Sequence, residues 1–237
     1  MVASTVSGRI DLRKEALFVL AYFVLYLGYM FIRPENEWMH WLTLVAIPFL
    51  TLAFWHKRTY GWTLSSTLAS FGLKRGNLKS GLGWAILLGL ALSLLQLFMS
   101  RQSDAFWELL RSGKALLYFP LALLLLLLTA GFTEEFFFRG VMQTRLVALL
   151  QSKFWAIIVT ALFFGIYHLP YAYLNPNWPS SGDWGAALTA ALGQGIPAGI
   201  VLGVLYARTK NNLLACIVLH SFINVLPAMT LIKFSGA

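Results

Sequence analysis

The stretch that decides the fold is LALLLLLLTAGFTEEFFFRG, residues 121–140. Its first half is almost entirely apolar, whereas its second half carries two adjacent carboxylates, Glu134 and Glu135, and a cation, Arg139. A charged side chain near the centre of a bilayer costs about 2.5–3.5 kcal/mol on insertion scales. Charges that follow a membrane-like run therefore require a partner or a function.

The composition is that of an integral membrane protein. Of the 237 residues, 59% are hydrophobic and 11% charged, and the mean hydropathy is +0.71. Seven apolar segments approach the length that crosses a bilayer, at about 16–32, 41–55, 81–99, 115–132, 153–168, 185–206 and 213–232. We therefore predict an all-α fold, a polytopic bundle of about seven transmembrane helices (six to eight), which forms a single integral-membrane domain over residues 1–237.

The net charge of +9 does not indicate a nucleic-acid partner, because the basic residues lie in short segments between the apolar runs. They are expected to contact membrane lipids and to set the topology. Of the 18 Lys and Arg residues, 13 fall in the segments on one side of the predicted membrane and 5 on the other. The positive-inside rule then places the N-terminus in the cytosol.

The carboxylates can be placed by helix geometry. The pattern after Phe132 stays helical without proline, so the fourth helix is expected to reach about Leu150 and to turn into the fifth at residues 151–153. At about 1.5 Å of rise per residue, Glu134 and His168 then lie at similar depths on the two arms of a hairpin. His220 and Asn224, on the seventh helix, are expected at the same level.

Local spacings agree with this arrangement. Glu135 and Arg139 are four residues apart and can pair on one helix face, while Glu134 points about 100° away from that face. His220 and Asn224 have the same spacing and can face one cavity. Acids and bases that pair inside a membrane usually mark a functional site.

Three short motifs now point to a known family. EEFFFRG (134–140) fits the pattern E-E-x-x-x-R, FGIYH (164–168) fits F-x-x-x-H, and HSFIN (220–224) fits H-x-x-x-N. In this order, and each on a predicted membrane helix, they resemble the CAAX-protease and bacteriocin-processing family of intramembrane glutamate endopeptidases. The resemblance covers about residues 115–230.

The resemblance implies peptide-bond hydrolysis without metal or cofactor. Glu134 would take a proton from water, His168 would hold the same water, and His220 and Asn224 would donate hydrogen bonds to the oxyanion. Glu135 and Arg139 would form the supporting pair. The substrate would be a peptide or protein, lipidated in the CAAX branch, which cleaves after a prenylated cysteine. The family also implies a multi-pass protein of a bacterial inner or cell membrane.

Several alternatives stay open at this point. Two Glu and two His could hold Zn²⁺, although no H-E-x-x-H sequence is present. Ser221 adjoins His220 but points about 100° away from it on a helix, so this adjacency is not a catalytic dyad. The same buried charges could serve a proton-coupled transporter, or the protein could be a non-cleaving membrane scaffold or regulator.

Two other features favour structural roles. His40 and His56 lie at helix ends, where a position at the membrane interface is expected. The sixth apolar segment carries a small residue at every fourth position from Ala191 to Ala207, which predicts close helix packing. Residues 1–110 contain no motif that identifies the substrate or the oligomeric state.

Overall fold

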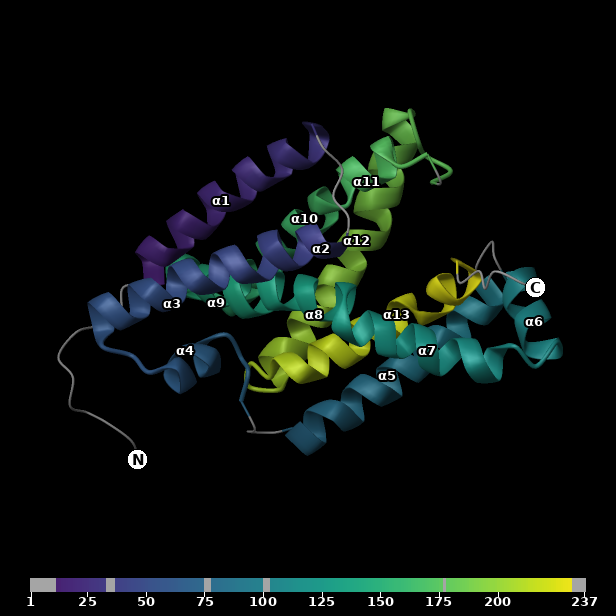
Figure 1. Ribbon diagram of the computed structural model, residues 1–237, viewed down its shortest axis with the longest axis horizontal. Helices are drawn as coiled ribbons and strands as arrows, with labels where there is room; N and C mark the ends of the chain where they lie inside the picture. The colour runs from purple at the N-terminus through teal and green to yellow at the C-terminus, as the bar shows by residue number, and fades with distance from the viewer. Residues whose placement is uncertain (1–11, 33–36, 75–77, 100–102, 177, 232–237) are drawn as a thin grey trace.

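The computed structural model describes residues 12–32, 37–74, 78–99, 103–176 and 178–231 (Figure 1). Within these ranges the chain forms helices and no strand. In chain order they are α1 (Leu12–Ile32), α2 (Glu37–His40), η1 (Trp41–Ala46), α3 (Ile47–Tyr60), α4 (Leu64–Ser70), α5 (Leu78–Met99), α6 (Ser103–Arg111), α7 (Ala115–Leu128), α8 (Ala130–Glu135), η2 (Phe136–Gln143), α9 (Thr144–Leu150), α10 (Lys153–Tyr167), α11 (Leu169–Leu174), α12 (Trp184–Arg208) and α13 (Leu213–Leu231). The elements labelled η are π-helices.

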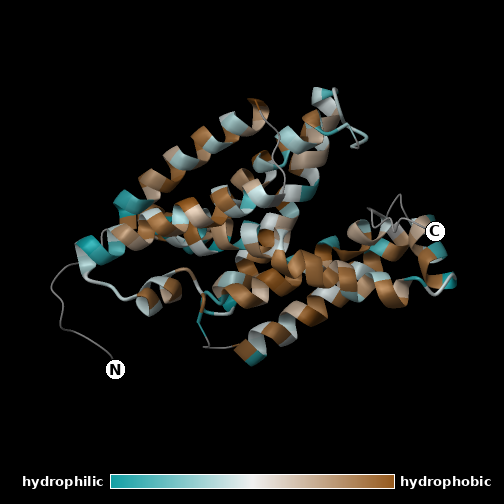
Figure 2. Cartoon of the chain, viewed as in Figure 1, coloured by the Kyte–Doolittle hydropathy of each residue, from teal (hydrophilic) through white to brown (hydrophobic). Residues whose placement is uncertain are grey.

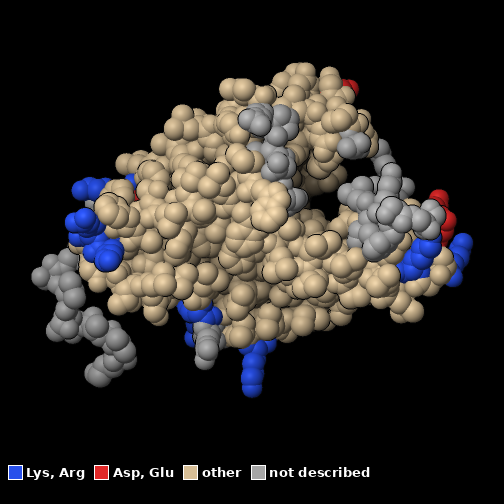
Figure 3. Space-filling view, viewed as in Figure 1, with Lys and Arg blue, Asp and Glu red and all other residues tan. Residues whose placement is uncertain are grey.

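The helices give the predicted number of membrane spans. Seven helical segments in the described chain are long and apolar enough to cross a bilayer: Leu12–Ile32, Trp38–Tyr60, Leu78–Phe98, Ala115–Leu150, Lys153–Leu174, Trp184–Arg208 and Leu213–Thr230. Each overlaps one predicted segment, so the all-helical membrane fold is confirmed. Apolar residues cover α5, α7 and α13, while hydrophilic residues gather toward the ends of the bundle (Figure 2). Lys and Arg lie at the margins of the molecule, beside a broad uncharged middle (Figure 3).

The fourth span is one long rod with two irregularities. The first is at Thr129, whose φ of −108° and ψ of −112° separate α7 from α8. The second is the π-helix η2, after which α9 continues the rod to Leu150. The chain then turns through Gln151, at φ 54°, and Ser152 caps α10. The predicted hairpin between the fourth and fifth spans is thus confirmed, whereas its π-helical part was not predicted.

Side chains satisfy backbone carbonyls at the end of η2. The Thr144 hydroxyl donates to the Arg139 carbonyl at 3.1 Å, and Arg145 Nη1 donates to the Gly140 carbonyl at 3.0 Å. Both contacts span five residues, the interval of the backbone hydrogen bonds in a π-helix. The two side chains therefore stabilise the π-helix next to the carboxylate motif.

The small-residue face of α12 packs against α10. Gly199 lies so near Ala161 that a β-carbon added at Gly199 would be 2.8 Å from the Ala161 Cα. Ala191, Gly195 and Gly203 on the same face are buried as well. The structure confirms the prediction that these residues serve packing.

A buried charged cluster joins α1, α3 and α9. Arg145 Nε donates to Glu15 Oε2 at 3.1 Å, and His56 Nε2 lies 3.1 Å from Glu15 Oε1. All three side chains are fully buried. His56 lies near one end of the span Trp38–Tyr60, and the packing of α1 against α9 encloses its side chain within the protein. Its position at the membrane interface stays a prediction. His40, near the other end of this span, is also buried and is hydrogen-bonded to the Tyr171 hydroxyl.

This burial changes the basis of the predicted topology. Arg139 and Arg145 were counted among the 13 basic residues of one side, but both are buried in ion pairs. They report helix packing and not the side of the membrane. Without these two residues, 11 Lys and Arg residues remain on the predicted cytosolic side and 5 on the other side, so the predicted orientation is unchanged.

Candidate active site

The predicted site residues come from three separate membrane spans. Glu134 and Glu135 end α8, Arg139 lies in η2, and His168 follows the last residue of α10. His220 lies in the middle of α13. The structure brings Glu134 close to His168 and His220, as the helix geometry predicted, and places Glu135, paired with Arg139, beside His220.

Glu134 faces both histidines. Its Oε2 atom lies 3.8 Å from His168 Nε2 and 3.8 Å from His220 Nε2. These separations exceed the usual 2.7–3.2 Å of a direct N–H···O hydrogen bond. Polar groups at such distances are commonly bridged by a water molecule.

Glu135 lies at the centre of a second set of contacts. Its Oε1 atom accepts from Arg139 Nη1 at 2.6 Å, which confirms the predicted pair. The same oxygen lies 2.7 Å from His220 Nδ1, a contact that the sequence analysis did not foresee. Arg139 also donates through Nη2 to the Gly199 carbonyl at 3.2 Å, which anchors the pair to α12.

The neighbours of each imidazole determine its proton positions. His168 Nδ1 lies 2.7 Å from the Phe164 carbonyl, which can only accept, so Nδ1 carries a proton. In the neutral ring, His168 Nε2 is therefore an acceptor and faces Glu134. His220 Nδ1 faces the Arg139-bound carboxylate of Glu135 and is likewise a donor.

The buried charges are best balanced when His220 is an imidazolium. Glu135 and Arg139 are fully buried, and Glu134 and His220 are nearly so, at 7% and 2% exposure. Buried charges are tolerated when they are paired. Two carboxylates and one guanidinium leave one negative charge, which a doubly protonated His220 would neutralise. In that form its Nε2 carries a hydrogen directed to the side of Glu134.

Phe164 is a site residue to which the sequence alone assigns no role. Its ring centroid lies 4.5 Å from the Arg139 guanidinium carbon. The ring also meets His168 and His220 edge-on, with centroids 4.7 and 5.8 Å apart. The first position of the FGIYH motif thus packs against both histidines and the cation, while its carbonyl orients His168. The spacing of Phe164 four residues before His168, on the same helix face, was the signal in the sequence that the ring would pack against this histidine.

Access to the site is on the side of His168. Its side chain is 24% exposed, whereas those of Glu134 and His220 are 9% and 3% exposed. A molecule that reaches the Glu134 carboxylate would therefore pass the imidazole of His168. The remaining walls are apolar and aromatic, with Phe138 and Tyr167 buried beside Phe164.

Asn224 and Ser221 differ from the other polar residues. Asn224 lies one turn after His220 on α13 and is half-buried, but its side chain forms no hydrogen bond or ion pair within the described part of the chain. Its role as an oxyanion donor therefore stays a prediction. Ser221 is buried and donates to the Ile217 carbonyl at 2.8 Å, which leaves its hydroxyl directed at the backbone of its own helix.

One comparison with known proteins gives a match, and it covers the segment that carries these residues. A search of the curated proteins and of the solved structures found no match to the chain. Residues 116–226 match the family model described as type II CAAX prenyl endopeptidase Rce1-like. The matched segment begins in α7, ends in α13, and contains all three motifs. The resemblance inferred from the motifs is confirmed, because the segment that carries the candidate site matches the family model of Rce1-like type II CAAX prenyl endopeptidases.

Proposed function

We propose that the protein is an intramembrane endopeptidase in which Glu134 and His168 activate water without a metal ion. The observation that carries this proposal is the 3.8 Å separation between Glu134 Oε2 and His168 Nε2. A water between them would donate one hydrogen to each acceptor. Its lone pair would then be directed away from both and toward a substrate carbonyl.

The reaction follows from these positions. The water oxygen attacks the carbonyl carbon of the scissile bond, and Glu134 takes the proton that the water loses. The carbonyl oxygen becomes an oxyanion, for which His220 Nε2–H and the Asn224 amide are the proposed donors. Loss of one such donor typically costs about 2.7–4 kcal/mol of transition-state stabilisation. Glu134 then returns the proton to the leaving amine, which completes hydrolysis of the peptide bond.

Glu135 and Arg139 are proposed as positioning residues. Glu135 accepts from His220 Nδ1, so it orients the ring and stabilises its doubly protonated form. Arg139 holds Glu135 through the 2.6 Å contact. Neither side chain needs to touch the substrate for this role.

The proposed substrate is a peptide or protein that reaches the site from the membrane. The matching family is described as a type II CAAX prenyl endopeptidase family, which indicates prenylated CAAX proteins as the substrate class. We extend that class to this chain as a proposal, with the N-terminus in the cytosol of a bacterial cell. The apolar walls and the exposure of His168 support entry by a lipidated or hydrophobic segment.

Substitution of Glu134 tests the proposal. Glu134→Gln keeps the size of the side chain but removes the proton acceptor, so cleavage of a peptide library by the purified protein in detergent should fall by about 10²-fold or more. Glu108→Gln is the matched control, because Glu108 is an exposed carboxylate on α6. It should leave cleavage unchanged.

Two results would point elsewhere. A wild-type protein that never cleaves a peptide, but loses proton-coupled transport in the Glu134→Gln variant, would be a transporter. A biological output unchanged by Glu134→Gln would indicate a scaffold. Normal thermal unfolding of the variant is required, so that loss of the base is separated from loss of the fold.

A further inference from the structure

A groove lies between α5 and α12, on elements that the proposed reaction does not use. Its volume is about 550 Å³, within the range of about 300–1,000 Å³ typical of ligand sites. Helix α5 lines it with Ser80, Trp84 and Leu88, and α12 lines it with residues that include Val201, Val204 and Arg208. Each set repeats at intervals of three to four residues, so each is one face of its helix.

The groove exists because α5 and α12 meet at one end only. A β-carbon added at Gly81 would lie 3.2 Å from Thr209 Cγ2, so the first turn of α5 touches the end of α12. Beyond this point α5 packs along α13, whereas α12 packs along α10. The facing side chains of the two helices are left without protein between them, and Trp84 is 56% exposed.

The two ends of the groove differ in polarity. The Ser80 hydroxyl and the Arg208 guanidinium lie at the end where the two helices converge. Away from that end, the walls are apolar and include Trp84 and Val204. Arg208 is exposed and forms no ion pair with any residue that the structure describes. No acidic side chain lines the groove. The polar end is therefore electropositive, and the rest of the groove suits a hydrocarbon chain.

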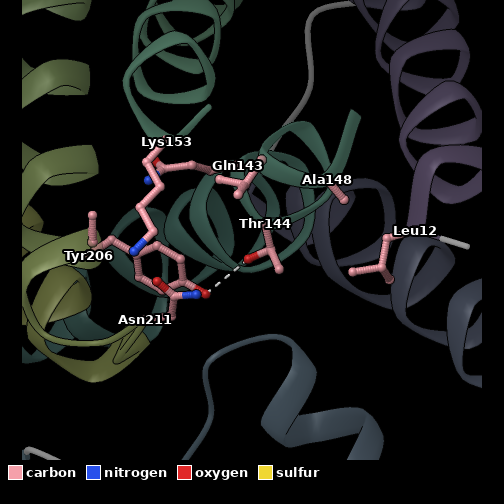
Figure 4. Close-up of a pocket in the computed structure, with 9 residues that line it drawn as sticks. Leu12, Gln143, Thr144, Ala148, Lys153, Tyr206 and Asn211 are labelled. Atoms are coloured by element: carbon pink, nitrogen blue, oxygen red, sulfur yellow. Dashed lines mark hydrogen bonds between the residues drawn. The ribbon is translucent and has the colours of Figure 1, made fainter. Parts of the chain in front are cut away.

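Another cavity in the structure is a weaker candidate for a ligand site. It measures about 210 Å³ and lies between α9, α10 and α12, where the Thr144 hydroxyl meets the Tyr206 hydroxyl at 3.2 Å (Figure 4). Lys153 extends along it and Asn211 lies beside Tyr206 (Figure 4). Because it is smaller than typical ligand sites and lacks a long apolar wall, it does not indicate a class of lipid or peptide.

We propose that the groove between α5 and α12 binds one anionic phospholipid, whose phosphate contacts Arg208 and Ser80 and whose acyl chain lies along Trp84, Leu88 and Val204. Charge complementarity selects an anionic headgroup, since Arg208 is the cation at the polar end. Both helices are long and apolar enough to cross the membrane, so lipid can reach the groove along its length. Under the proposed topology this lipid belongs to the cytosolic leaflet. It would fill the space between two helices that flank α13, the helix of His220.

Lipid retention by the purified full-length chain tests the proposal. The protein in detergent is titrated with phosphatidylglycerol or phosphatidylcholine of identical acyl chains, and bound lipids are counted by native mass spectrometry. One phosphatidylglycerol should bind in preference to phosphatidylcholine. Arg208→Gln should weaken phosphatidylglycerol binding by about fivefold, the loss expected for one basic contact near the membrane surface, and leave phosphatidylcholine unchanged.

Two further variants locate the lipid. Lys210→Gln removes an exposed cation near the same end but outside the groove, and it should retain wild-type binding. Val204→Trp fills the groove from an exposed position and should abolish the preferential site.

Four results would overturn the proposal. Equal affinity of the wild type for both lipids would show that the headgroup is not selected, and an equal loss in Arg208→Gln and Lys210→Gln would show diffuse surface charge. Full binding by Val204→Trp would place the lipid elsewhere. A dimer that forms in competition with phosphatidylglycerol would assign the groove to a second copy of the chain. If Val204→Trp does not purify, the comparison of the Arg208 and Lys210 variants decides alone.

Discussion

Glu135 and His220 are 85 residues apart in the chain, yet Glu135 Oε1 lies 2.7 Å from His220 Nδ1. The same oxygen accepts from Arg139 at 2.6 Å, so one buried carboxylate connects the E-E-x-x-x-R motif to the H-x-x-x-N motif. The two adjacent glutamates of the first motif thus have different surroundings. Glu134 faces two imidazole nitrogens across 3.8 Å, and Glu135 is in direct contact with a cation and an imidazole.

Glu135→Gln should lower stability before it lowers the rate of chemistry. The substitution leaves Arg139 buried without its counter-charge, and breaking a buried pair costs about 3–5 kcal/mol. Thermal unfolding in detergent and the yield of folded protein measure this loss. Glu134→Gln is the matched comparison, with a large loss of cleavage and near-normal unfolding. Equal damage to stability from both substitutions would contradict the separate roles.

Glu15→Gln should destabilise the protein although Glu15 lies outside the matched segment. Arg145 would stay buried without its carboxylate, at a cost of about 3–5 kcal/mol. The double variant Glu15→Met/Arg145→Met removes both charges and should be more stable than Glu15→Gln. Lys57→Gln, at an exposed position on α3, should change the free energy of unfolding by less than about 0.5 kcal/mol. A Glu15→Gln variant as stable as Lys57→Gln would show that the cluster contributes little.

Cleavage should survive a strong chelator such as phenanthroline. The reason is that Glu134 and His168 can activate water between them without a Lewis acid, and the sequence lacks the H-E-x-x-H signature of many zinc proteases. The rate of peptide cleavage before and after chelation is the measurement. Loss of activity that added Zn²⁺ restores would replace the glutamate mechanism with a metal mechanism.

Reporter fusions should place residues 56–79 in the cytosol and residues 169–184 on the opposite side. The physical basis is the excess of Lys and Arg in the first of these segments, since residues 169–184 contain none. The labelling of single cysteines introduced into each segment is an independent measurement. The reverse labelling of either segment would overturn the orientation and leave the geometry of the site unchanged.

Much of the site could be predicted because helices have a regular rise and rotation. The spacing of four residues gave the pair of Glu135 and Arg139, and the lengths of the hairpin arms gave the common depth of Glu134 and His168. His220 could be placed at that depth by the same count. These are relations within a helix or across one turn, for which local geometry is sufficient.

Relations between distant helices could not be predicted in the same way. The contact of Glu135 with His220 depends on how α13 rotates against α8, and no local pattern fixes that angle. The sequence shows that His56 lies at a helix end, but its enclosure by α1 and α9 depends on how these helices pack, which no local pattern fixes. The π-helix η2 was not foreseen, because its sequence is compatible with an ordinary α-helix.

The π-helix η2 constrains how many residues can lie between Glu135 and Arg145. An α-helix rotates by about 100° per residue, so the extra residue of a wider turn changes the angular offset between the two ends of the rod. One end of η2 is fixed by Glu135, and the other is fixed just beyond it by the contact of Arg145 with Glu15. Deletion of any one residue from 136–143 would rotate either Glu135 away from His220 or Arg145 away from Glu15. The spacing of this segment is therefore constrained independently of its side chains, and a shortened variant with every charged residue intact would still lose either the carboxylate alignment or the attachment to α1.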